Sequence, residues 1–177
     1  MTEIVLDTVV IIGYGWPFDT SHSCCCRFFN EYPFESNSFY YPKKVKEELK
    51  YKRIKISREN PGFEVELRRM HQFIDRFLEE SQKLDYENSE YNWHSIYFTI
   101  EEVMKKYQQK PTDRISFDAN HITNYICFCL EREESSDHFF ITGDTALYDT
   151  RRELWKAACN FLGKEIPFSI KNIRNLR

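Results

Sequence analysis

Short apolar runs alternate with longer segments of helical periodicity along this chain. The runs at 3–6, 38–41 and 139–142 are rich in β-branched and aromatic residues, a composition that favours buried strands. Between them, apolar residues recur every three or four positions, most clearly over 64–84, which predicts amphipathic helices. Strands that alternate with helices indicate an α/β protein with a mostly parallel sheet, and we expect strand 3–6 near its centre.

The predicted helices account for most of the remaining chain. One begins directly after the first strand, at Asp7 or Thr8, and 167–170 is expected to form an edge strand, where proline is tolerated. The other helices are expected at 22–31, from Pro42 through a basic stretch, and at 64–84, 96–107, 116–130 and 151–161. A length of 177 residues suffices for one hydrophobic core, so we expect a single domain, 1–177, with a helical insertion at about 52–112.

Composition narrows the class of protein. The chain is 41% hydrophobic and 30% charged, which is typical of globular proteins, and no apolar run approaches the roughly 18 residues of a membrane span. Glu3 stands where a signal peptide would carry basic residues, so we expect a cytoplasmic protein without membrane association. The six cysteines, three of them consecutive at 24–26, indicate free thiols, and a zinc site that includes His22 is the alternative.

Two of the predicted strands run into the same kind of ending. Residues 4–6 lead into Asp7 and Thr8, and residues 139–142 lead into Gly143 and Asp144. The carboxyl ends of parallel strands meet at one edge of a sheet, where ligands bind. The two endings therefore predict one shared acidic site.

Two further carboxylates, Glu48 and Asp118, stand on predicted helices near this edge. Converging carboxylates repel one another and need a cation, and an all-oxygen ligand set suits Mg²⁺ or Mn²⁺. Each residue taken alone also fits a local role. Asp7 and Asp144 are suitable helix N-caps, Asp118 suits a first helical turn, and Glu48 suits a solvated helix face.

The order of these motifs resembles that of the PIN-domain nuclease family. The matching segments are Ile4-Val5-Leu6-Asp7-Thr8, Tyr41-Pro42 through Glu48-Leu49, Asp118 through Ile122, and Ile141-Thr142-Gly143-Asp144, of which the last is the most specific. The resemblance covers 3–51 and 118–168. Competing choices within the motifs are Glu47, Asp113 and Asp149.

The resemblance implies a three-layer α/β/α fold and the metal-dependent hydrolysis of single-stranded or structured RNA. It implies that Asp7, Glu48, Asp118 and Asp144 are the catalytic residues and the ligands of Mg²⁺ or Mn²⁺. Small members of the family act as toxins, so an antitoxin-like protein is an expected partner, and a homo-oligomer is another.

Several other side chains are candidates for contact with RNA. Thr8 and Thr142 either position the aspartates and a water or bond locally to the backbone. His121 either packs in the core or contacts a phosphate. A basic stretch begins with Lys43, Lys44 and Lys46 and reaches Lys55. Together with Arg174 and Arg177, this stretch either binds phosphates or forms a solvated face. The aromatic residues Trp16, Tyr40 and Tyr41 either stack on bases or pack in the core.

Two alternatives to a nuclease follow from the same features. A catalytically inactive PIN-like module would bind RNA or protein without turnover. A haloacid-dehalogenase-like phosphatase needs a second aspartate two residues after the first, where this chain has Val9. A receiver domain needs paired acidic residues near the chain start, which this chain lacks, so the inactive module is the stronger alternative.

Overall fold

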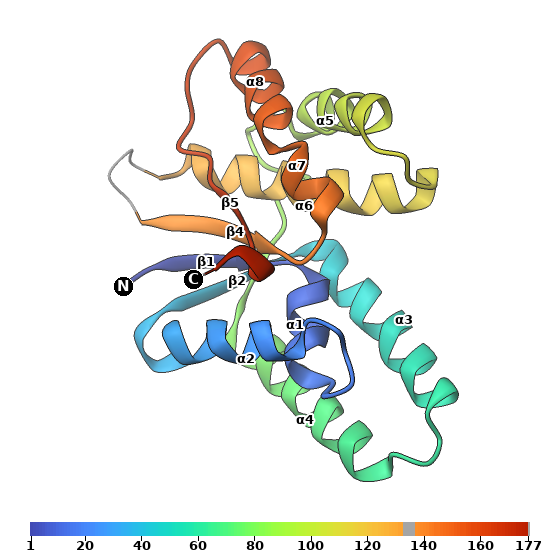
Figure 1. Ribbon diagram of the computed structural model, residues 1–177. Coiled ribbons are helices and arrows are strands. Elements are labelled where there is room, and N and C mark those ends of the chain that lie inside the picture. Colours follow the sequence, from blue (N-terminus) through green and yellow to red (C-terminus); the bar gives the residue numbers. More distant parts are fainter. Residues whose placement is uncertain (133–136, 177) are drawn as a thin grey trace.

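A five-stranded, all-parallel sheet forms the centre of the computed structural model, which describes residues 1–132 and 137–176 (Figure 1). The strand order is β3-β2-β1-β4-β5, so the first strand lies in the middle, as predicted. The strands are β1 (Glu3–Leu6), β2 (Ser38–Pro42), β3 (Gln82–Leu84), β4 (His138–Thr142) and β5 (Ile170–Asn172). Because β1 and β4 are paired in parallel with Leu6 opposite Ile141, the residues that follow them emerge side by side.

Helices cover both faces of this sheet (Figure 1). They are α1 (Thr8–Gly15), α2 (His22–Glu31), α3 (Lys43–Glu59), α4 (Glu64–Glu80), α5 (Trp93–Tyr107), α6 (Thr112–Leu130), α7 (Thr145–Asp149) and α8 (Arg151–Leu162). Side chains of α1 to α4 form one hydrophobic core with Ile4 and Leu6, and α5, α6 and α8 form the other with Val5. Alternate residues of β1 thus face opposite layers, as strand geometry requires. The result is the three-layer α/β/α architecture expected from the sequence.

The boundaries of some elements differ from the predictions. The helix predicted at 64–84 ends at Glu80, and 82–84 form β3 instead, with Leu84 paired to Pro42. A three-residue strand directly after a helix has no period of its own, which is why the apolar spacing missed it. The segment 52–112 therefore contributes a strand to the sheet as well as helices.

Other differences lie later in the chain. The edge strand predicted at 167–170 begins only at Ile170, where pairing with Phe140 starts. The helix predicted from Ser116 begins at Thr112, directly after Pro111, and the short helix α7 was not predicted. These shifts leave Asp118 on a helix and Asp144 at a strand exit, as expected.

Candidate functional site

Asp7 and Asp144 lie together at the carboxyl edge of the sheet. The Asp7 amide donates a hydrogen bond to the Ile141 carbonyl oxygen at 3.1 Å, which continues the pairing of β1 with β4 past the strand end. The Thr142 hydroxyl donates to Asp7 Oδ2 and accepts a hydrogen bond from the Asp144 amide at 2.9 Å. Thr142 therefore ties the two strand endings to each other.

The helix-cap role fits one of the two aspartates. Asp144 Oδ1 accepts a hydrogen bond from the Leu147 amide at 3.0 Å and caps α7. Asp7 precedes α1, but its side chain makes no capping bond in the described structure, although the residue is only 4% exposed. A buried carboxylate that does not cap its helix is available for another role.

Glu48 reaches the same place from α3. Its Oε2 atom accepts a hydrogen bond from the Thr8 hydroxyl and lies 3.8 Å from His121 Nε2. The other imidazole nitrogen, Nδ1, lies 3.7 Å from Asp7 Oδ1. The neighbouring Glu47 is exposed and pairs with Lys44 at 2.8 Å, so Glu48 is the glutamate that joins the cluster. We call Asp7, Glu48 and His121 the histidine half of the site.

Asp118, on α6, lies against a lysine that sequence reasoning missed. Lys110 Nζ lies 2.6 Å from Asp118 Oδ2 and 2.7 Å from Asp144 Oδ2. Lys110 sits in the loop between α5 and α6, and nothing in its local sequence distinguishes it from the other basic residues. We call Lys110, Asp118 and Asp144 the lysine half of the site. The competing Asp113 and Asp149 are both exposed.

Burial and charge shift the pKa values of the four carboxyls in different directions. Burial raises the pKa of Asp7 and of Glu48, and neighbouring charges and hydroxyls offset this only in part. Burial also raises the pKa of Asp118 to about 6, although Lys110 acts against it. For Asp144, burial alone would raise the pKa, but hydrogen bonds from Lys110 and from the Leu147 amide outweigh burial and lower it. Three of the four carboxyls therefore keep raised pKa values, and direct contact with Lys110 outweighs burial only at Asp144.

The residues of the histidine half fit a divalent cation. One donor atom from each of Asp7, Glu48 and His121 lies within 4.8 Å of the others. His121 is fully buried, and neither ring nitrogen has a hydrogen-bond partner among the described residues. Burial lowers the pKa of His121, which favours the neutral imidazole that ligates metals. An unpartnered, buried imidazole between two carboxylates is a donor set that a cation would complete.

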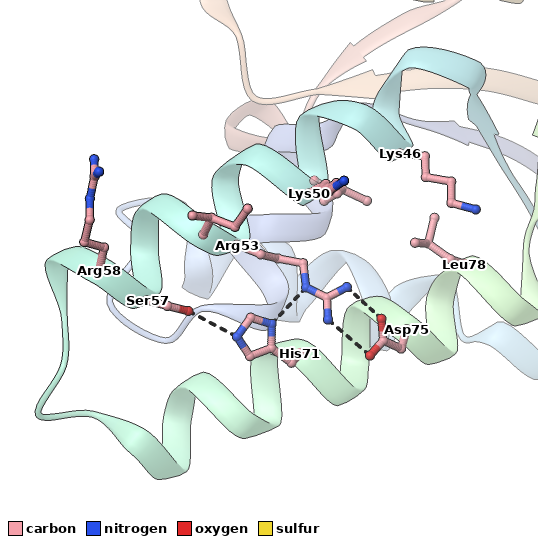
Figure 2. A pocket seen from close by; sticks show the side chains of 10 residues that line it. Lys46, Lys50, Arg53, Ser57, Arg58, His71, Asp75 and Leu78 are labelled. Atoms are coloured by element: carbon pink, nitrogen blue, oxygen red, sulfur yellow. Dashed lines mark hydrogen bonds and ion pairs between the residues drawn. The ribbon is translucent and has the colours of Figure 1, made fainter.

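The basic residues predicted to bind RNA have diverse surroundings. Lys43 pairs with Asp85 at 3.3 Å and Glu87 at 2.8 Å. Lys46 lines a groove of about 770 Å³ between α3 and α4, which Figure 2 shows from close by. The other residues that line this groove are Leu49, Lys50, Arg53, Ile54, Ser57, Arg58, His71, Asp75 and Leu78. Arg53 is held there by Asp75 at 2.6 Å and by His71 at 2.8 Å.

The remaining candidates from the sequence are the aromatic residues, the cysteines and the C-terminal arginines. Trp16, Tyr40 and Tyr41 are at most 7% exposed and pack in the two hydrophobic cores, so core packing accounts for them. All six cysteines are free thiols, and none belongs to the group in the described chain that could hold a metal. Arg174 is exposed, and Arg177 lies outside the described residues. Across 1–132 and 137–176, no helix combines the length and hydropathy needed to span a membrane.

Comparison with known proteins gives one informative similarity. No protein-family model and no curated protein sequence matches the chain. A chain of the crystal structure of VapBC2 from Rickettsia felis, bound to a DNA fragment from their promoter, is similar in structure with a TM-score of 0.53. The similarity covers 97% of this chain and 98% of that chain at 11% sequence identity, a level at which it concerns the fold alone. The chain has the PIN-like α/β fold that its sequence motifs predicted.

Proposed function

We propose that this protein is a divalent-metal-dependent endoribonuclease. The observation that carries the proposal is the convergence of Asp7, Glu48, Asp118 and Asp144, from four separate elements, at the carboxyl edge of a parallel sheet. The electrostatic coupling of Asp7 to Glu48, Asp144 and His121 supports a single shared site. The PIN-like fold supports the same reading, because ligands bind at this edge of open α/β sheets.

The four-carboxylate site would take Mg²⁺ or Mn²⁺, held most directly by Asp7 and Glu48 with Asp118 and Asp144 beside them, and the bound ion would make a water molecule more acidic and offset charge on a phosphodiester. Thr142 and Thr8 hold one oxygen each of Asp7 and Glu48, so the carboxylates are oriented before substrate arrives. Lys110 uses two of its three N–H donors on Asp118 and Asp144. We assign the third donor to a phosphate oxygen of the RNA.

The groove between α3 and α4 is the path we propose for the RNA backbone. Lys46, Lys50 and Arg58 line it and outnumber its one acidic residue, Asp75. Clustered cations attract phosphates and release counterions, so binding here weakens as salt rises. Lys50→Ala should reduce RNA affinity several-fold and lower the salt slope by about 1, whereas Lys55→Ala, on the same helix outside the groove, should not.

Cleavage of a labelled, structured RNA by metal-depleted protein supplied with Mn²⁺ tests the activity. Asp118→Asn should lower the rate by at least about 10²-fold, because it removes a charge in direct reach of the site. Asp113→Asn is the matched control on the same helix, and should retain the wild-type rate. Unchanged cleavage by Asp118→Asn, or cleavage that persists in excess chelator, would refute the proposal.

A catalytically inactive module that binds RNA or protein is the second candidate. The observation in its favour is Lys110, whose ammonium already neutralises Asp118 and Asp144. Isothermal titration separates the two functions: absence of Mn²⁺ binding at millimolar concentration, together with absence of cleavage, favours the inactive module.

We expect a protein partner whether the chain is a nuclease or an inactive module. The similar structure is that of VapBC2 bound to promoter DNA, which supports an antitoxin-like partner for this chain, with a second copy of the chain as the other expectation. Sedimentation of the purified protein, alone and with the product of a neighbouring gene, distinguishes these partners.

A further inference from the structure

His121 occupies an unusual position for a buried histidine. It lies on α6 at 0% exposure, with Nδ1 directed to Asp7 and Nε2 directed to Glu48. The separations of 3.7 and 3.8 Å are too long for hydrogen bonds, and no other described residue bonds to either nitrogen. Both polar atoms of a fully buried ring are therefore left unsatisfied.

Such an arrangement is costly unless something else satisfies it. A buried polar atom without a hydrogen-bond partner loses the solvation it had in water, and this ring has two such atoms. Asn124, one turn further along α6, is by contrast well satisfied. Its amide nitrogen donates to the Asn120 carbonyl oxygen at 2.9 Å, and its oxygen accepts from the Tyr86 amide at 3.1 Å. The side-chain amide of Asn124 thus has hydrogen-bond partners, whereas the imidazole of His121 faces two carboxylates without one.

We propose that His121 is a nitrogen ligand of the cation held by Asp7 and Glu48, and that this centre therefore prefers a transition-metal ion to Mg²⁺. The proposal rests on the proposed function, since it concerns the same site and specifies its ion. Imidazole suits first-row transition metals, whereas Mg²⁺ takes an almost purely oxygen environment. Affinity then rises from Mn²⁺ towards Co²⁺ and Zn²⁺.

The distances in the histidine half agree with this assignment. Ligand bonds of about 2.0–2.2 Å place neighbouring donor atoms roughly 3–3.5 Å apart. With one donor atom taken from each of Asp7, Glu48 and His121, the three atoms lie within 4.8 Å of one another, so the side chains would close in on a bound ion. One ring nitrogen would bind the ion, and the N–H on the other would donate to the opposite carboxylate, which is the common second contact of a metal-bound histidine.

Contacts in the lysine half are the reason why we place the ion in the histidine half. Lys110 Nζ already lies within 2.7 Å of both Asp118 and Asp144. Lys110 supplies positive charge there by direct contact, whereas in the part of the chain that the structure describes Asp7 and Glu48 contact neutral hydroxyls and the imidazole. Lys52, Arg114 and Lys110 act on Glu48 from further away, without forming an ion pair with it. The unmatched negative charge and the unpartnered nitrogens therefore lie at the same point.

Metal binding without RNA tests the inference. Metal-depleted protein is titrated with Mn²⁺ and with Mg²⁺ by calorimetry, and the Mn²⁺ complex is measured by electron spin echo spectroscopy. We expect Mn²⁺ to bind at least about tenfold more tightly than Mg²⁺, and we expect ¹⁴N coupling from a bound imidazole. In His121→Asn the coupling should disappear and Mn²⁺ affinity should fall at least about tenfold, with Mg²⁺ affinity changed less. His94→Asn removes an exposed histidine and should change neither quantity.

The outcomes separate this inference from the proposed function. Mn²⁺ binding without ¹⁴N coupling in the wild type, or equal affinity for the two ions, overturns the histidine ligand even if RNA is still cleaved. Failure of the wild type to bind either ion and to cleave RNA overturns the proposed function and this inference together. If His121→Asn does not fold, the wild-type spectrum and the ratio of the two affinities still decide.

Discussion

The two halves of the carboxylate cluster balance their charge by different means. In the lysine half, Lys110 contacts both Asp118 and Asp144 directly, and the pKa of Asp144 is lowered as a result of that contact and its capping bonds. In the histidine half, no Lys or Arg among the described residues forms an ion pair with Asp7, and burial keeps the pKa of Asp7 raised. Burial still raises the pKa of Asp118 to about 6. The difference between the halves is therefore one of contact: a positive side chain touches both carboxylates of the lysine half, whereas the histidine half has an imidazole in that place.

The largest expected effect comes from a change in the histidine half. Glu48→Gln should lower Mn²⁺ affinity at least about tenfold and the cleavage rate by about 10²–10³-fold, because it removes a charge from the half whose carboxylates form no ion pair with a described Lys or Arg. Calorimetry and RNA cleavage measure the two effects. Glu47→Gln, at the neighbouring exposed position, is the control, and equal behaviour of the two variants would remove the distinction between the halves.

Removal of the Lys110 ammonium should mainly lower the stability of the metal-free protein. Lys110→Met leaves Asp118 and Asp144 without their cationic partner and should destabilise the metal-free protein by roughly 2–4 kcal/mol, less than for a fully buried pair since Asp144 is 28% exposed. Mn²⁺ should restore more stability to this variant than to the wild type. Urea unfolding with and without Mn²⁺ provides the measurement.

Lys105→Met is the surface control, since Lys105 pairs with Glu101 on its own helix and its ammonium lies in solvent, so loss of the pair should cost little. A loss for Lys110→Met no larger than for Lys105→Met would mean that Lys110 does not neutralise its half.

The pH dependence of stability should report on Asp118. Its pKa of about 6 in the folded protein exceeds the ordinary value of 3.8, so the folded state binds the proton more tightly than the unfolded state. Stability of the metal-free protein should therefore fall as pH rises from about 4 to above 6, by roughly 3 kcal/mol at most from this group. Asp118→Asn, which cannot titrate, should flatten the curve, and thermal melts between pH 4 and 8 measure it. A wild-type curve that rises over this interval would contradict the expectation.

The smallest expected effect concerns the hydroxyl that joins the two strand endings. Thr142→Val removes the donor to Asp7 Oδ2 and the acceptor for the Asp144 amide, with little change of shape. We expect a loss of about 1–2 kcal/mol in stability and a several-fold loss of Mn²⁺ affinity. Thr99→Val, which loses only a bond to its own helix at Ser95, is the comparison, and identical results for both variants would remove Thr142 from the site.

Much of this fold follows from short-range pattern. Apolar runs at strand length and apolar spacing at helix length predicted the parallel sheet. The central position of β1 was predicted because its ending has to meet those of the later strands. The predictions were wrong at β3 and α7, because elements this short do not show a repeating pattern of apolar residues. The choice of Glu48 over Glu47 also followed from the sequence motif, and the structure places Glu48 against Thr8.

The sequence by itself predicted that Asp7 and Asp144 meet at one edge of the sheet, since strand endings carry their own local signal, and the resemblance to a known family added Glu48 and Asp118 on helices. Only the tertiary structure decided how those carboxylates divide, because Lys110 and His121 gain their roles from neighbours that lie far away along the chain. Lys110 meets Asp144 across 34 residues, and the imidazole lies between Asp7 and Glu48 from a third element. Electrostatic interactions depend on distance in space and on burial, which no local pattern records.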